Sequence, residues 1–458
     1  YIVFDLTASE GGGYVVLKGR LNPDTKHYDV NAETHRFAVN HFRTSLGIGT
    51  VDATASAAGK GYDPFNVQTQ IAAKAKVGAL QYGSYHLTDV QLDALIAHGR
   101  TKASLDSRNT YLNGEIALKA LNSDRILKGT MSGDIGRINL YNLGVTKVPL
   151  SLGMCSHLDF NCDFGENVYL SGNISDITIA DTVRKFNPDD ITLDIFSSAD
   201  TTHAVVDCGD FYASLNAHGS YKHLIKKGTA LADIVMDDLS KHEINLPNLW
   251  NELPLVSFRL KTGAENPLSR FLKFHGIKFD VADIDLQSTP VHGVNGDISL
   301  YGVVADSIQL DTIRMKIDSD EDNCVFSGQV RNNKNNPQFV FNALLDGKIM
   351  EHGLEAYVTV KDRHDRVGLR IGADAEVEDN RLNMHILDDK GIVIGYEDFT
   401  VNSDNHVSFA KRNRVSADLR LRSVTGKGIG IYSNDDSPDV LQDLTVAIAN
   451  MDLGDLLF

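Results

Sequence analysis

The side chains that could hold a metal occur in this sequence only as incomplete patterns. Asp318, Asp320 and Asp322 have the opening spacing of a calcium-binding loop, in which alternate carboxylates approach one ion. Such a loop needs Gly at its sixth position and Glu at its twelfth, whereas this sequence has Asn323 and Gln329 there. Without the flexible turn and the closing bidentate carboxylate, we predict an acidic hairpin rather than a calcium site.

The 16 histidines show no spacing that belongs to an active site. His242 and Glu243 begin the pattern of a zinc-protease helix, but Leu246 occupies the place of the second histidine. Ser220 lies between two histidines and has no G-x-S-x-G sequence around it. A nucleophile without a positioned base is not activated. We therefore predict no Ser–His or Cys–His catalytic pair and no enzymatic activity.

The glycine-rich segments and the cysteines predict structure rather than chemistry. Residues 11–13 and 426–430 complete neither a P-loop nor a dinucleotide fingerprint, so we expect turns or strand bends there. None of the four cysteines forms a CxxC pair or has zinc-site spacing to histidine. Cys155 and Cys162 are close enough to form a disulfide across a hairpin in an oxidising compartment; free thiols are the other interpretation. We expect no cofactor and no metal.

The composition favours a folded, strand-rich chain of unusual extent. A length of 458 residues exceeds one ordinary core and predicts several domains or a repeat array. Glycine is common (38) and proline scarce (10), which suits many turns between strands. The net charge of −17 argues against nucleic acid and anionic membrane surfaces as partners. No apolar run approaches the roughly 20 residues of a membrane span, and both ends cut through apolar pattern, so we expect a segment of a longer protein.

The elements that position these residues are predicted mainly from an alternation of apolar and polar side chains with period two. Over residues 351–390, three alternating runs are separated by polar turns, which predicts a β-meander. Over residues 298–317 the parity of the apolar residues flips at Asp311 and Thr312, which predicts a bulge or tight turn. A weak repeat of Gly, an acidic residue or Asn, and Ile begins at positions 114, 133, 172 and 296.

A helical middle separates two β-rich parts. Apolar spacing predicts a helix over residues 223–242. A second helix is predicted from Asn266 as N-cap and Pro267 as first residue to Gly276 as terminator, and a helical turn over residues 179–186. Three segments follow from this pattern, namely β-repeats at 1–176, a mixed segment with helices at 177–290, and β-repeats at 291–458.

One face of the predicted sheet consists of Leu, Ile, Val, Met and Ala, with few large aromatic side chains that would fill a closed sandwich. A curved sheet with such a face leaves a long apolar trough, and exposed apolar surface of that extent marks an interaction site. An ordinary closed core is the alternative. The candidate groove-lining residues share one apolar parity: Ile298, Leu300, Ile308, Leu310, Leu369, Ile371, Leu382 and Met384.

Two stretches of the sequence resemble repeats of the TamB/AsmA-like family. They are residues 80–94 followed by 103–106, and residues 306–315 leading to 326–330. The similarity is one of cadence, and it covers most of residues 14–176 and 291–425. The family resemblance implies a mainly β fold, an elongated antiparallel repeat sheet curled into a U-shaped apolar trough, here with a few short helices in the middle.

The resemblance also implies a function and a location. It implies a periplasmic segment of a protein anchored in the inner membrane, with phospholipid acyl chains and an outer-membrane β-barrel as partners. The implied roles are phospholipid transport between the membranes and the assembly and secretion of outer-membrane proteins, without catalytic residues. A closed β-rich structural or adhesin-like module is the alternative. For the trough we expect Leu369→Asp or Leu382→Asp to interrupt lipid transfer.

Overall fold

The computed structural model describes most of the chain. The described residues are 1–10, 12–41, 47–82, 85–143, 145–241, 246–305, 308–321, 323–332, 340–350, 353–378, 381–410, 414–435 and 442–451.

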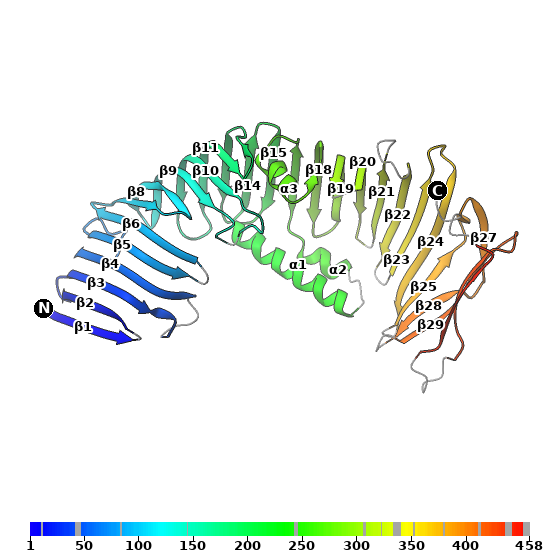
Figure 1. The fold of residues 1–458 in the computed structure, drawn as a ribbon, viewed down its shortest axis with the longest axis horizontal. Coiled ribbons are helices and arrows are strands. Elements are labelled where there is room, and N and C mark those ends of the chain that lie inside the picture. Colours follow the sequence, from blue (N-terminus) through cyan, green and yellow to red (C-terminus); the bar gives the residue numbers. More distant parts are fainter. Residues whose placement is uncertain are drawn as a thin grey trace. The chain divides into compact units, whose positions relative to one another are not determined.

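The described chain forms one antiparallel sheet of 31 strands with three α-helices, which confirms the predicted mainly β class (Figure 1). It divides into two compact units, residues 1–212 with 265–267 and residues 213–264 with 268–458.

The strands of the first unit are β1 (Ile2–Glu10), β2 (Gly13–Asn22), β3 (His27–Ala38), β4 (Ile48–Lys60), β5 (Gln70–Tyr82), β6 (Tyr85–Ala97), β7 (Arg100–Arg108), β8 (Leu112–Ser123), β9 (Ile126–Asn139), β10 (Ser151–Cys162), β11 (Val168–Ala180), β12 (Lys185–Phe186), β13 (Ile191–Ser197) and β14 (Thr201–Cys208). A 3₁₀ turn, η1 (Val39–His41), follows β3, and β15 (Phe211–His218) spans the boundary.

The remaining elements are α1 (Tyr221–Lys241), α2 (Leu246–Glu252), β16 (Val256–Thr262), α3 (Pro267–Phe274), β17 (Ile277–Lys278), β18 (Val281–Thr289), β19 (Gly293–Ala305), β20 (Ile308–Ser319), β21 (Cys324–Arg331), β22 (Asn342–Met350), β23 (Gly353–Lys361), β24 (Val367–Glu378), β25 (Arg381–Leu387), β26 (Ile392–Ile394), β27 (Glu397–Val401), β28 (His406–Ala410), β29 (Arg414–Ser423), β30 (Gly428–Ser433) and β31 (Leu444–Ala449).

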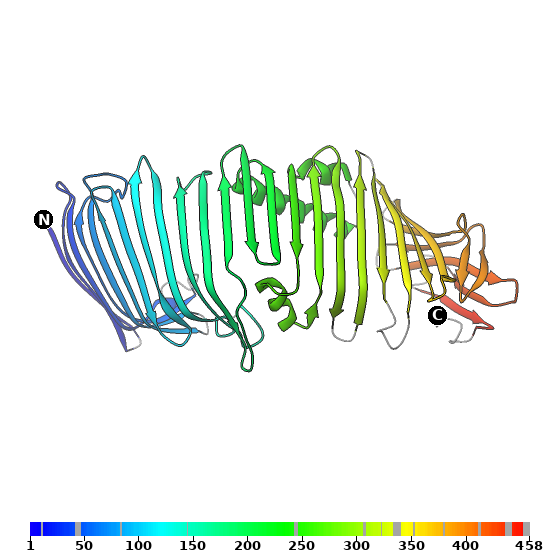
Figure 2. The ribbon, with the colours of Figure 1, turned by 90° about the horizontal axis from the view of Figure 1, so that it is seen from above.

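Within each unit, strands that follow one another along the chain mostly lie side by side as hairpins (Figure 2). Directly paired residues of antiparallel strands share a face, and successive residues point to opposite faces. The period-two pattern of the sequence therefore becomes two chemically different faces of the sheet. This ladder pairs the backbone polar groups of neighbouring strands.

The predicted β-meander is confirmed by β23, β24 and β25, which pair in antiparallel order. Its second turn, at 379–380, lies outside the described residues. The predicted bulge or tight turn at Asp311 and Thr312 is not found. β20 runs as one strand from Ile308 to Ser319, and its register with β19 is the same on both sides of the unpaired Gly302 and Asp311. The change of apolar parity in the sequence is therefore a change of face along one strand.

The helical predictions are confirmed in two places and wrong in one. Helix α1 occupies the long amphipathic run, and α3 begins at Pro267 and ends before Gly276, whose φ is 82°. Residues 179–186 form no helical turn, because they close the hairpin of β11 and β12. There the Asp181 side chain accepts hydrogen bonds from the backbone N–H groups of Val183 and Arg184, and this favours a turn over a helix.

The repeated glycines lie inside strands and allow close packing of neighbouring backbones. Gly172 and Gly296 have φ of 152° and 147°, and a Cβ on either would lie about 2 Å from the carbonyl oxygen of His157 or Asp285. The repeats at Gly114, Gly172 and Gly296 thus combine a close backbone approach with an apolar residue two positions later, whereas a Cβ at Gly133 would first meet the Ser156 side chain. The repeat reflects strand packing and not a ligand-binding loop.

Two small closed cores lie in the second unit. The first is formed by Ile392, Ile394, Phe399 and Leu421, where β26 and β27 fold against β29. The second joins α2 to the sheet through Leu246, Trp250 and Cys324. None of the described helices is long and apolar enough to cross a membrane.

Candidate functional site: the apolar and polar faces of the sheet

In the first unit, one face of the sheet is apolar across consecutive strands. We call this the apolar face. On this face, residues that are directly paired from strand to strand form rows across the sheet, and one of these rows contains mostly aliphatic side chains. Its members are Leu6, Leu17, Ala32, Ala55, Ala75, Leu92, Leu105, Ile116, Gly133, Ser156, Ile174 and Ile191. Leu6 and Leu92 remain 59% and 42% exposed, so no described layer covers this face there.

The opposite face, which we call the polar face, carries charges in matched pairs. Lys74 is directly opposite Asp93, and their side chains lie 3.5 Å apart. Arg20 is opposite Asp29 at 3.2 Å. Cross-strand pairs of opposite charge stabilise a sheet, although each exposed pair contributes little. The two faces therefore differ as the sequence pattern predicts.

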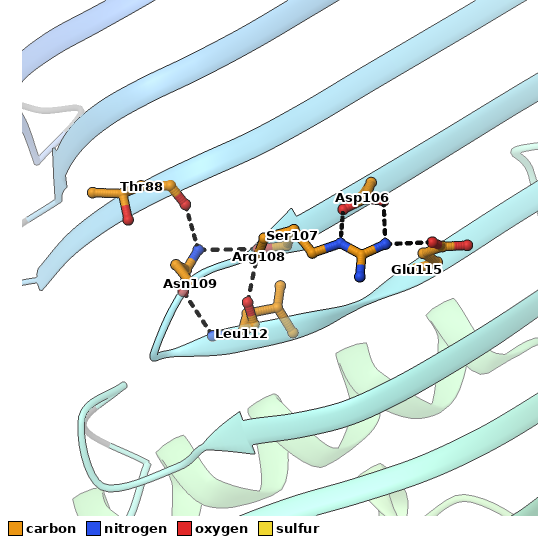
Figure 3. Close-up of polar contacts among 7 residues, drawn as sticks. All are labelled: Thr88, Asp106, Ser107, Arg108, Asn109, Leu112 and Glu115. Atoms are coloured by element: carbon orange, nitrogen blue, oxygen red, sulfur yellow. Dashed lines mark hydrogen bonds and ion pairs between the residues drawn. The ribbon is translucent and has the colours of Figure 1, made fainter.

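At one place on the polar face, a cation joins two carboxylates that oppose each other. Asp106 of β7 is paired with Glu115 of β8, and Arg108 lies within 2.7 Å of both (Figure 3). The hydrogen bond from Arg108 lowers the pKa of Asp106 below its ordinary value. Next to it, Asn109 caps the turn by accepting from the Leu112 N–H and donating to the Thr88 carbonyl. This set is structural, since every member is satisfied by the others.

In the second unit, six of the eight predicted lining residues lie on one face. Ile298 belongs to a paired row that crosses β18 to β24 and ends at Ile371. Leu300 and Leu369 belong to the neighbouring row of the same face. Leu382 and Met384 of β25 lie on this face too, because they are paired with Val377 and Ala375, which follow Ile371 along β24 at even spacing. We call the first row the apolar strip: Ile284, Ile298, Met315, Gly328, Leu345, Val358 and Ile371.

The remaining two predicted residues lie beyond the interruption in β19 and β20. Ile308 is paired with Ala305 and Leu310 with Val303, after the skipped pair. Ile308 is 59% exposed. By the alternation of side chains along β20, they point to the face opposite that of Met315, so they do not lie on the face of the apolar strip.

The apolar strip is accessible in its middle and covered at its sides. Met315 and Leu345, on either side of Gly328, are 36% and 38% exposed. Helix α2 covers Ile317 at one side, and Trp250 Nε1 donates to the Asp320 carbonyl oxygen at 3.1 Å. Figure 1 shows α1 and α2 together on one side of the second unit's strands. At the other side, Leu369 packs against the closed core around Ile392.

The sequence analysis missed Leu345 as a lining residue. It lies in a run of apolar residues, Ala343 to Leu345, where alternation gives no indication of the outward side. Only the register with Gly328 and Val358 places it on the strip. Met315 lies in a run that does alternate, so its face could be inferred from sequence but its exposure could not.

Of the incomplete metal-binding patterns, the acidic segment at 318–322 is described in part, and His242 and Glu243 lie outside the described residues. Asp320 accepts from the Asn323 backbone in a tight turn, as the hairpin prediction requires, while Asp322 lies outside the described residues. Within the described chain, no group of three or more His, Cys, Asp or Glu residues is arranged to hold a metal ion. All four cysteines are free, including Cys155 and Cys162. Burial raises the pKa of the Cys208 thiol to about 11.

Comparisons with protein-family models, with curated proteins and with solved structures found no match to this chain.

Proposed function

We propose that the chain is a non-catalytic, periplasmic segment of a TamB/AsmA-like protein that offers its apolar face to phospholipid acyl chains. In this role it takes part in phospholipid transport between inner and outer membrane, and in the assembly and secretion of outer-membrane proteins. One observation supports the proposal above the others. Seven strands that lie side by side, namely β16 and β18 to β23, place apolar residues on one face in register. The middle of that face stays accessible.

Removal of acyl methylenes from water supplies the binding free energy on the apolar face. Transfer of a methylene group out of water contributes about 0.8 kcal/mol, without any need for directional contacts. A face of aliphatic side chains in successive rows therefore holds a chain of methylenes equally well at each row. Such a surface permits movement along it, which transport requires, whereas polar anchors would fix one position. An unfolded β-strand with apolar side chains is a ligand for the same face.

The closed core around Ile392 supports the second candidate for its own part of the chain. The alternative function is a closed β-rich structural or adhesin-like module, and such modules bury their apolar residues between layers. Ile392 is 1% exposed and Phe399 5%. In the proposal this core ends the lipid-binding surface, and Leu369 belongs to it rather than to the open strip.

The test is mass spectrometry of lipids extracted from the full chain after purification in mild detergent. An unrelated β-rich protein of similar size, purified in the same way, is the control. We expect phospholipid in near-stoichiometric amount, well above the control. Protein without lipid above the control level would exclude the open apolar face as a lipid site and favour the closed module.

A further inference from the structure

Four cations lie close together on the polar face of the first unit. They are Arg100 and Lys102 of β7, Lys119 of β8 and Lys128 of β9. Lys102 is directly opposite Lys119, and Lys128 is opposite Leu121, two residues beyond Lys119 on the same face. Directly opposite Cβ atoms are about 5 Å apart and diagonal ones about 7–8 Å. All four side chains are exposed, and none is hydrogen-bonded or ion-paired to another described residue.

This arrangement differs from that of Asp106 and Glu115 on the same face. Like charges directly opposite each other destabilise a sheet. Between Asp106 and Glu115, the guanidinium of Arg108 supplies a counter-charge from within the chain (Figure 3). For Lys102 and Lys119, no described side chain does the same. The missing counter-charge therefore points to an anion from outside the chain.

The cations line an open hollow of about 650 Å³. Among the described residues that line it, Asp159 carries the one carboxylate, so the hollow is strongly positive although the chain has a net charge of −17. Apolar side chains surround the charges. Leu121 and Tyr169 line the hollow at 54% and 38% exposed, and Leu95 and Phe196 adjoin it at 49% and 41%.

We propose that this hollow binds the phosphate headgroup of an anionic phospholipid. A phosphate accepts several charge-assisted hydrogen bonds at once, so one group can engage cations from three adjacent strands. The surrounding Leu and Tyr side chains suit the glycerol and the first methylenes, which distinguishes a lipid from a free phosphate ion. The site lies on the face opposite the apolar face, so it does not depend on the function proposed above.

The experiment is calorimetric titration of the full chain with short-chain phosphatidylglycerol below its micelle concentration. Phosphatidylcholine with the same acyl chains reports any binding of tails to the apolar face, and inorganic phosphate reports binding of an ion. The test variant is Lys102→Gln/Lys119→Gln. The matched control is Lys60→Gln/Lys76→Gln, which removes two exposed cations from the same face, each opposite a glutamine.

We expect phosphatidylglycerol to bind at least about tenfold more tightly than either comparator, with an affinity that falls as salt increases. The test variant loses about tenfold or more of this affinity, and the control variant keeps it. Equal loss in both variants would overturn the assignment of the site, and equal binding of the two lipids would do the same. Inorganic phosphate binding as tightly as the lipid would overturn the choice of ligand.

A further variant separates loss of binding from loss of folding. Lys119→Glu converts the opposed like charges into an opposite pair with Lys102, so it should raise the melting temperature while it abolishes phosphatidylglycerol binding. A lower melting temperature in this variant would contradict the premise that the native pair is repulsive and would overturn the inference.

Discussion

Replacing both Met315 and Leu345 by Asp should interrupt lipid binding on the apolar strip. The strip runs from Ile284 on β18 to Ile371 on β24, and six interstrand steps of about 4.8 Å give it a length of about 29 Å. An acyl tail spans half of a hydrocarbon core about 30 Å thick, hence about 15 Å. A tail lying along the strip therefore crosses at least one of the two substituted strands, β20 or β22.

The magnitude follows from the methylenes that lose apolar contact. One interstrand step of tail contains on the order of three methylenes, worth about 2 kcal/mol if fully buried. Because the strip covers the tail from one side only, we take about half, or roughly 1 kcal/mol for each site. Two sites then weaken binding by on the order of 30-fold, since 1.4 kcal/mol corresponds to a factor of ten.

The assay is a titration of the full chain with a fluorescent phospholipid, with circular dichroism to verify the fold. The matched control is Val325→Asp, which introduces the same group at a 47% exposed valine of the neighbouring strand, on the other face and opposite Lys348. An unchanged affinity in the folded double variant would refute the assignment of the strip. An equal loss in Val325→Asp would refute the assignment of the face.

Three further predictions concern the supporting structure. Ile392→Ala should lower the free energy of unfolding by about 2–4 kcal/mol in denaturant titration, because the side chain is 1% exposed in a closed core; a loss under 1 kcal/mol would contradict that packing. Arg108→Gln should lower stability at neutral pH. Because Arg108 lowers the pKa of Asp106, its contribution is present above the ordinary pKa of 3.8 and is lost as the pH falls below it, so the melting temperatures of wild type and variant should converge in acid. Cys162 should react with a maleimide at pH 8 well before Cys208, whose pKa is raised to about 11 by burial; equal rates would place Cys208 at the surface.

For the proposed lipid-binding face, the structure changes which of the predicted substitutions is informative. Leu369→Asp would put a carboxylate against the closed core around Ile392, so loss of folding would accompany any loss of lipid transfer. Leu382, opposite the 40% exposed Phe409, lies at a more tolerant position. Met315 is the better site, because it is accessible before substitution.

The sequence by itself determined the local structure and the chemistry of each face. Alternation with period two requires a strand with two unlike sides, so the mainly β class and the meander at β23 to β25 could be predicted. The sequence signals that predicted helix α1 and the start of α3 at Pro267 also lie within each segment itself. The helical turn predicted at residues 179–186 was wrong for a local reason too. The apolar spacing of this segment fits a short helix, and it fits equally well a hairpin closed by an aspartate turn.

Only the tertiary structure decided which residues of equal parity are open and which are covered. Ile371 and Leu369 have the same pattern in sequence, yet Leu369 is paired directly with Ile394 of β26 and packs against the closed core around Ile392. The opposition of Lys102 and Lys119 likewise depends on the register between β7 and β8. Register and coverage arise from pairings between residues distant along the chain, whose geometry no single stretch of alternating side chains can encode.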